Sequence, residues 1–152
     1  MKRTIATIIV LLALGYLAFD YYKSDSVSHI GVVTHVRDGD TIEIGDEVFR
    51  LAGISAPERS DEEGNDATTF MKGLVLAKEV DCEPTGDMSH DRFVAVCFID
   101  GEDIGEAIIE AGLARDCPRH SHGRYEDAEK RAIESGHNLS ATYELPGYCI
   151  PK

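Results

Sequence analysis

The chain has 152 residues, of which 43% are hydrophobic and 28% are charged. This length suits one domain with a sizeable core, and the composition excludes a collagen-like, wholly disordered or multi-span membrane protein. Asp and Glu number 28 against 15 Lys and Arg, so the net charge is -13, and a polyanionic partner must be held by local groups rather than by bulk charge.

The first residues have the pattern of an export signal. Basic residues in 1–3 precede an apolar run over 5–19, an order typical of segments that start in the cytoplasm and enter the membrane. We expect residues 1–23 to be an uncleaved signal anchor that holds the inner membrane through residues 4–22; a cleaved signal peptide is the alternative. A polar linker, 24–28, would then join it to a domain on the extracytoplasmic side, in the periplasm or at the cell surface, or secreted if cleaved.

Short β-prone runs follow, separated by turn residues such as Asp-Gly-Asp and Gly-Asp. Runs of this length between such turns predict strands. The predicted strands are 31–36, 41–44, 47–54, 79–83 and 92–99, and the polar stretch 84–91 is predicted to connect the last two.

Apolar residues recur at three- and four-residue spacing in three other segments, which predicts amphipathic helices over 66–77, 103–111 and 125–134. Residues 138–152 are rich in turn residues and predict an irregular tail. Three strands, a helix, two strands and then helices predict an α+β domain over 29–137, a five-stranded barrel of the OB type with about three helices. An α+β sandwich fits the same order of elements.

All four cysteines lie in the exported part, where an even count predicts two disulfides. Three pairings are possible. Cys82 and Cys97 fall in neighbouring predicted strands, so their pairing is plausible, and it leaves Cys117 to tie down the tail through Cys149. A zinc site is the weaker alternative because no Cys-x-x-Cys spacing occurs.

Three motifs carry the residues suited to chemistry. They are the turn Asp38-Gly39-Asp40-Thr41, the stretch from Arg50 to Glu58, and Asp91-Arg92. Carboxylate oxygens suit a hard ion such as Ca²⁺, and planar guanidinium groups bind phosphate oxygens through paired hydrogen bonds. Together these groups favour phosphodiester hydrolysis, in which a carboxylate directs water and the cations stabilise charge at phosphorus.

At these motifs the chain resembles the thermonuclease family, the staphylococcal-nuclease-like domains. The family pattern is an Asp-Gly-Asp-Thr turn, an Arg-Leu-x-Gly-Ile-Asp-x-Pro-Glu stretch and a later Gly-Arg, and the resemblance runs from about Gly31 to Gly136. It implies an OB-fold barrel and Ca²⁺-dependent cleavage of DNA and RNA.

The resemblance also implies roles for single residues. Asp40 stands where the family has a metal ligand, Arg50 and Arg92 where it has two phosphate-binding arginines, and Glu58 where it has the proposed general base. Thr41 matches a supporting residue beside the metal. Asp38 matches the turn behind it, one step removed from the ion.

The sequence departs from the family pattern at a ligand position. Ser55 stands where the family has its second metal-binding Asp. A neutral hydroxyl is a poor ligand for a hard dication, so metal affinity should fall, with Ser55 acting weakly or through its backbone. Asp91 replaces the Gly before Arg92, with which it is placed to pair.

A small basic stretch follows Cys117 and includes Arg119 and Arg124, with Tyr125 beside them. These three residues are candidates for guiding a nucleic-acid strand by phosphate attraction and base stacking. A solvated loop tied down by Cys117 is the alternative.

The sequence thus predicts a monomeric, membrane-anchored, Ca²⁺-dependent nuclease acting on single-stranded or unpaired DNA or RNA. The alternative is a catalytically weakened or inactive OB module that binds nucleic acid or a protein partner. It is favoured by Ser55, by Asp91 and by the charge of the exported part, in which 12 basic and 26 acidic residues give a net -14. Action on some other phosphodiester is a third possibility.

Overall fold

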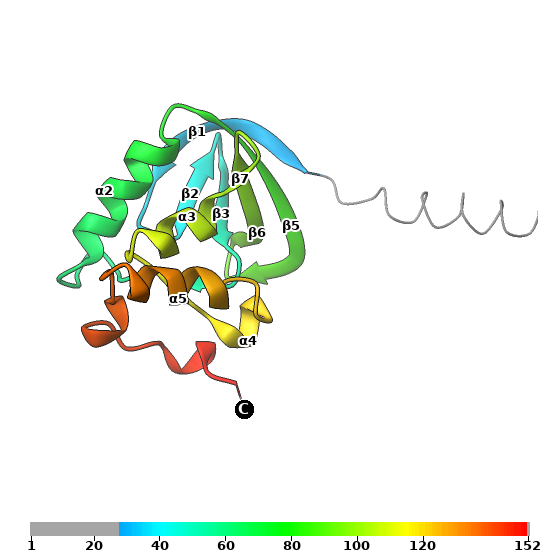
Figure 1. The fold of residues 1–152 in the computed structure, drawn as a ribbon. Coiled ribbons are helices and arrows are strands. Elements are labelled where there is room, and N and C mark those ends of the chain that lie inside the picture. Colours follow the sequence, from blue (N-terminus) through cyan, green and yellow to red (C-terminus); the bar gives the residue numbers. More distant parts are fainter. Residues whose placement is uncertain (1–27, 152) are drawn as a thin grey trace, which may run out of the picture.

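The computed structural model describes residues 28–151 (Figure 1). The predicted membrane segment and all but the last residue of the predicted linker lie outside these residues. Within 28–151, no helix has the length and apolar character needed to cross a bilayer.

Eight strands make up the sheets. Five of them form the barrel, and turns separate their β-prone runs. Of the other three, each of two residues, one extends the barrel sheet and two pair with each other in a separate small sheet. The barrel strands are β1 (His29–Val36), β2 (Thr41–Ile44), β3 (Glu47–Leu51), β5 (Glu79–Ser89) and β6 (Arg92–Ile99); the short ones are β4 (Ile54–Ser55), β7 (Glu102–Asp103) and β8 (Arg115–Asp116).

The barrel is closed by one parallel contact. The strand order is β3-β2-β1-β5-β6-β7, with β3 also pairing with β6. In that parallel pairing Arg50 lies opposite Val94, whereas the other pairings between barrel strands are antiparallel. The predicted five-stranded barrel is therefore confirmed as a closed mixed barrel consistent with an OB-like fold.

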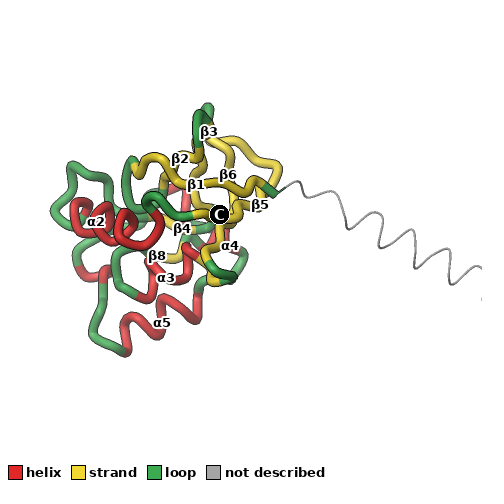
Figure 2. The backbone as a smooth tube through the Cα atoms, turned by 90° about the horizontal axis from the view of Figure 1, so that it is seen from above, coloured by secondary structure: helices red, strands yellow, loops and turns green. Residues whose placement is uncertain are grey.

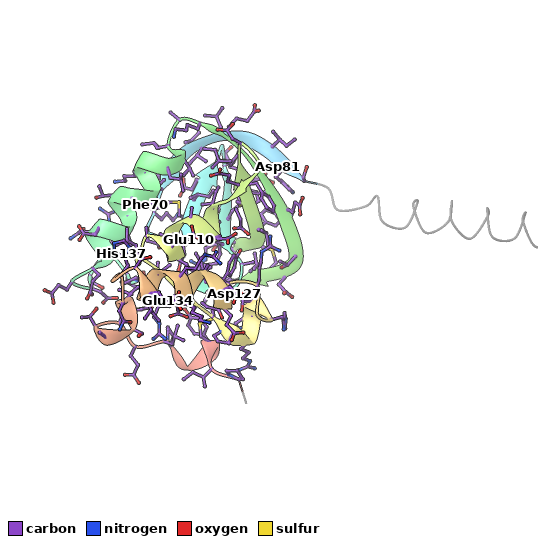
Figure 3. All side chains as sticks on the ribbon, viewed as in Figure 1. Phe70, Asp81, Glu110, Asp127, Glu134 and His137 are labelled. Atoms are coloured by element: carbon purple, nitrogen blue, oxygen red, sulfur yellow. A yellow bond between two sulfur atoms is a disulfide. The ribbon has the colours of Figure 1, made fainter. Side chains whose placement is uncertain are left out.

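Four helices cover it: α2 (Gly64–Val75), α3 (Ile104–Glu110), α4 (Pro118–Ser121) and α5 (Glu126–Glu134). In Figure 2, α2, α3 and α5 gather on one side of the strands. Figure 3 shows Glu110 of α3 and Asp127 and Glu134 of α5 on this helical layer, and Asp81 on β5 near the start of the described chain.

A single apolar core joins the barrel to these helices. It contains Ile42 and Phe49 from the barrel, Met71 from α2 and Ile108 from α3, all fully buried. Because α3 contributes to the same core as the strands, it closes the barrel interior on the side where α5 packs over it.

Two disulfides join Cys82 to Cys97 and Cys117 to Cys149, as predicted. The first links directly opposed residues of β5 and β6. The second ties the tail, with its short 3-10 turns Leu139–Ala141 and Gly147–Cys149, to the residue before α4.

Several predicted bounds differ from the structure. The predicted strand 47–54 is two strands, β3 and β4, because Gly53 adopts a positive φ of 71° between them. Strand β5 continues through most of the stretch predicted as a connection, since residues 85–88 are exposed and their polarity does not oppose strand pairing. Residues 28–151 contain four helices rather than about three, because the four-residue α4 is too short to show a periodic pattern.

Candidate active site

The turn between β1 and β2 sets the position of Asp40. A side-chain oxygen of Asp38 accepts a hydrogen bond from the Asp40 amide at 3.0 Å, an arrangement that stabilises tight turns. Gly39 is needed for close packing, because a Cβ there would lie 2.7 Å from the Cβ of Ala56 and 2.8 Å from that of Ala67. The turn is therefore pressed against the segment after β4.

The Asp40 carboxylate is buried, with the residue 7% exposed, and both of its oxygens have partners. Oδ2 forms an ion pair with Arg50 and accepts a hydrogen bond from the Ala56 amide at 3.1 Å. Oδ1 accepts the Thr41 hydroxyl at 3.1 Å. This carboxylate is the group around which the predicted site residues assemble.

Thr41 connects Asp40 to the second arginine. Its fully buried hydroxyl donates to Asp40 and accepts a hydrogen bond from Nη1 of Arg92 at 3.3 Å. Arg92 also donates to the carbonyl oxygen and hydroxyl of Ser89, at 3.3 and 3.1 Å. Within residues 28–151 no ion pair joins Arg92 to Asp91, so the pairing of these neighbours that the sequence suggested is not seen there.

Strand pairing brings Arg50 into the same place. Arg50 lies opposite Thr41 on β2 and opposite Val94 on β6, two residues beyond Arg92. Residues two apart on a strand share a face. Nη2 of Arg50 makes only long contacts, to the Ile54 carbonyl at 3.4 Å and to the Tyr148 hydroxyl at 3.5 Å. The structure thus brings together four predicted site residues, Asp40, Thr41, Arg50 and Arg92.

Glu58 lies on the segment that follows β4. Its amide donates to Asp61 at 2.8 Å, which fixes the backbone at this point. Its side chain is exposed and has no hydrogen-bond or ion-pair partner among the residues that the structure describes. A carboxylate held in this way is free to meet water or substrate.

Ser55 is 1% exposed, and its hydroxyl lies 3.0 Å from the Tyr143 hydroxyl. Tyr143 donates its one proton to the Ala56 carbonyl at 3.1 Å, so Ser55 is the donor to the Tyr143 oxygen. Burial raises the pKa of Tyr143, an effect that the Ser55 hydroxyl partly opposes. The Ser55 hydroxyl therefore donates its proton to a residue of the tail.

Tyr143 and Tyr148 are contacts that the sequence reasoning missed. Both lie in the tail, which carries no motif. The sequence does place Tyr148 next to Cys149, and a disulfide that includes Cys149 keeps Tyr148 close to the domain.

A Ca²⁺ ion requires six to eight oxygen ligands, commonly from several carboxylates. Asp40 is the one carboxylate in the assembled group, and its oxygens already have protein partners. Nowhere in 28–151 do three His, Cys, Asp or Glu residues gather closely enough to hold a metal. This donor set does not fit a tight Ca²⁺ site.

The structure does not bring Arg124 and Tyr125 to this site. Tyr125 is 2% exposed, and its hydroxyl donates to Asp103, which also pairs with Arg124. Burial raises the pKa of Tyr125, so its hydroxyl stays a donor. With its ring in the core, Tyr125 has no face on which a base can stack. Arg119 is exposed on α4.

The sequence pattern of the family described as "Staphylococcal nuclease homologue" matches residues 48–140, more than half of the chain. The chain belongs to this family. The predicted membership is thereby confirmed, and the matched range contains Arg50, Ser55, Glu58 and Arg92.

Three curated relatives are similar to the chain. A "Succinoglycan biosynthesis protein ExoI" of Rhizobium meliloti is 35% identical over 66% of this chain and 59% of its own length. An "Uncharacterized endonuclease" of Escherichia coli O157:H7 is 34% identical over 55% and 58%, and one of Haemophilus influenzae is 30% identical over 72% and 65%. The chain thus spans about six tenths of the length of these relatives.

Proposed function

We propose that this chain is a nuclease that hydrolyses phosphodiester bonds of DNA or RNA with unpaired strands. One observation carries the proposal: Thr41 and Asp40 join the guanidinium groups of Arg50 and Arg92 in one hydrogen-bonded group. Family membership and two relatives named as endonucleases support it.

In the proposed reaction Arg50 and Arg92 bind the oxygens of one phosphodiester group and stabilise the charge that develops at phosphorus. The long contacts of Nη2 of Arg50 leave this nitrogen able to turn to a phosphate oxygen. Glu58 orients a water molecule and accepts its proton as the water oxygen bonds to phosphorus. The bond between phosphorus and the leaving sugar oxygen breaks, and that oxygen takes a proton from solvent. Asp40 and Thr41 hold the guanidinium groups of the two arginines in position relative to each other.

The proposal also includes Ca²⁺ dependence, export and membrane anchoring. The resemblance implies Ca²⁺, with Asp40 as its carboxylate ligand, but the donor set described above does not supply a tight site, and no step is assigned to the ion. Two disulfides support export, since such bonds persist in oxidising compartments.

The test uses the purified full-length chain and labelled single-stranded DNA and RNA, with Ca²⁺ and with a chelator. Glu58→Gln should lower the cleavage rate by about 10² to 10³, because it removes the general base. Glu62→Gln is the matched control, since Glu62 is an exposed neighbour with the same charge. Equal loss in both variants, or no cleavage by the native chain under any condition, would contradict the proposal.

A second candidate function, a non-catalytic nucleic-acid-binding module, is favoured by the hydroxyl at Ser55 and its commitment to Tyr143. Ser55→Asp separates the two candidates. A gain of about tenfold or more in cleavage and in Ca²⁺ affinity, the latter measured by calorimetry, would indicate a weakened nuclease. Oligonucleotide binding without cleavage in both native and variant chains would indicate the binding module.

A further inference from the structure

The tail, residues 138–151, runs from the end of α5 to α4 along one side of the molecule (Figure 1). It has no long helix or strand, yet two of its side chains contact the candidate site. Tyr143 contacts Ser55 and Ala56, and Tyr148, which is 52% exposed, contacts Arg50. The contacts of Tyr143 are short and internal, whereas that of Tyr148 is long and at the surface.

A continuous hydrogen-bond path leads from Tyr143 to the Asp40 carboxylate. The Tyr143 hydroxyl donates to the carbonyl oxygen of Ala56 at 3.1 Å, and the amide of the same residue donates to Asp40 at 3.1 Å. The Ser55 hydroxyl donates to the same Tyr143 oxygen at 3.0 Å. One tail hydroxyl thus fixes the backbone segment that holds Asp40 and that continues, two residues later, to Glu58.

Tyr143 is itself held at two points. Its carbonyl oxygen accepts a hydrogen bond from Arg115 of β8 at 3.1 Å, and Arg115 is oriented by an ion pair with Glu129 at 2.7 Å. Further along, the Cys117–Cys149 disulfide ties the tail to the residue before α4. Strand β8 pairs with β4, so the anchor of the tail and the segment it fixes belong to one small sheet.

We propose that Tyr143 is a positioning residue of the site: its hydroxyl holds the Ser55–Ala56 segment, which leads to Glu58, so that the Ala56 amide stays on Asp40. The expected effect on catalysis rests on the proposed nuclease function. The expected effect on the position of the Ser55–Ala56 segment does not depend on that function.

The role follows from how Asp40 is satisfied. Its Oδ2 is shared between Arg50 and the Ala56 amide. If the segment moves away, Oδ2 loses the Ala56 amide and keeps Arg50 as its one partner, so fewer groups fix the position of the Asp40 carboxylate. Displacements of about 1 Å in such groups are enough to slow an enzyme by about 10²-fold.

The experiment compares the full chain with Tyr143→Phe, which keeps the ring and removes the hydroxyl. Amide hydrogen exchange is followed by NMR at Ala56, with the fully buried barrel residue Phe49 as an internal reference. We expect exchange at Ala56 to become about tenfold faster while exchange at Phe49 is unchanged, because one local hydrogen bond is lost without global unfolding. Thr142→Val, which removes a neighbouring tail hydroxyl bonded to Leu139, is the matched control and should change neither.

Cleavage of single-stranded DNA by the same proteins gives the second measurement. Tyr143→Phe should lower kcat about tenfold with little change in KM, since the substrate-binding arginines remain. Unchanged Ala56 exchange, or equal changes at Ala56 and Phe49, would overturn the proposal. If the native chain does not cleave while Ala56 exchange still responds, the nuclease function fails and the positioning role of Tyr143 stands.

Discussion

Strand pairing in the barrel brings Arg50 and Arg92 together, whereas one disulfide and a few hydrogen bonds bring Tyr143 to the same place. The barrel contribution is distributed over many backbone hydrogen bonds and a shared core. The tail contribution depends on single contacts between residues 87 and 88 positions apart in the sequence. We therefore expect a substitution in the barrel part of the site to abolish the proposed cleavage activity. A substitution in the tail should instead make the position of the site residues less fixed.

The largest effect is expected in the barrel. Arg50→Lys keeps the positive charge beside Asp40 but removes the planar guanidinium, so we expect cleavage to fall by about 10² to 10³. Arg131→Lys is the matched control, because Arg131 pairs with Glu106 and Glu110 on the helical layer. Steady-state kinetics on labelled oligonucleotides measure both. Native activity in Arg50→Lys would show that the barrel contribution does not depend on the guanidinium group of Arg50.

The next effect is expected in the tail. Replacing Cys117 and Cys149 together by Ala opens a link between residues 32 positions apart. A cross-link of this span stabilises a fold by about 3 to 4 kcal/mol, because it restricts the unfolded chain. Denaturant unfolding should show this loss, and the surviving folded protein should show faster exchange at Ala56. Full protection of Ala56 in this variant would mean that the tail holds without its disulfide.

A residue outside both regions sharpens the comparison. Asp103 caps α3 through the amides of Gly105 and Glu106 and accepts the buried Tyr125 hydroxyl. Asp103→Ala should cost about 2 to 3 kcal/mol of unfolding free energy, through the lost cap and the unpaired hydroxyl. Cleavage per folded molecule should not change. A fall in kcat under conditions where the variant is folded would show that the helical layer also positions the site.

The smallest effect concerns the point where tail and barrel meet. Burial raises the pKa of Asp116, aided by Glu129 and Glu126 and opposed by the Ser121 hydroxyl. The folded state therefore binds this proton more tightly than the unfolded state, and stability falls as pH rises above the ordinary value of 3.8.

Asp116→Asn should accordingly raise the unfolding free energy at pH 7, and this gain should disappear near pH 3, where both states carry the proton. Thermal unfolding at the two pH values provides the measurement. Asp127→Asn, an exposed carboxylate on α5, is the control. A gain that is equal at both pH values would show that the effect does not come from the charge.

Much of the barrel could be predicted because its strands are local patterns. The hairpin of β2 and β3 lies where the β-prone runs and the Gly-Asp turn place it. The order of the motifs likewise indicated the family to which the chain belongs. The length of β5 and the short helix α4 could not be predicted, since cross-strand pairing and packing decide them rather than local composition.

The site was predictable to a similar extent. The sequence identified Asp40, Arg50 and Arg92 as one group, and their proximity follows from strand register. It could not show that Thr41 bridges them, because that depends on where one buried hydroxyl points. Nor could it show that Tyr125 lies inside, since a tyrosine beside two arginines suits a surface equally well.

What the sequence by itself determined, then, is the family, the barrel and the presence of Ser55 where the family pattern has Asp, because these are properties of local pattern and of residue identity. Only the tertiary structure decided that the Ser55 hydroxyl is bound to Tyr143 and that Asp40 is enclosed by Arg50, Thr41 and Ala56. The reason is physical: hydrogen bonds between distant segments form only after the chain has closed on itself, so no short stretch of sequence contains them.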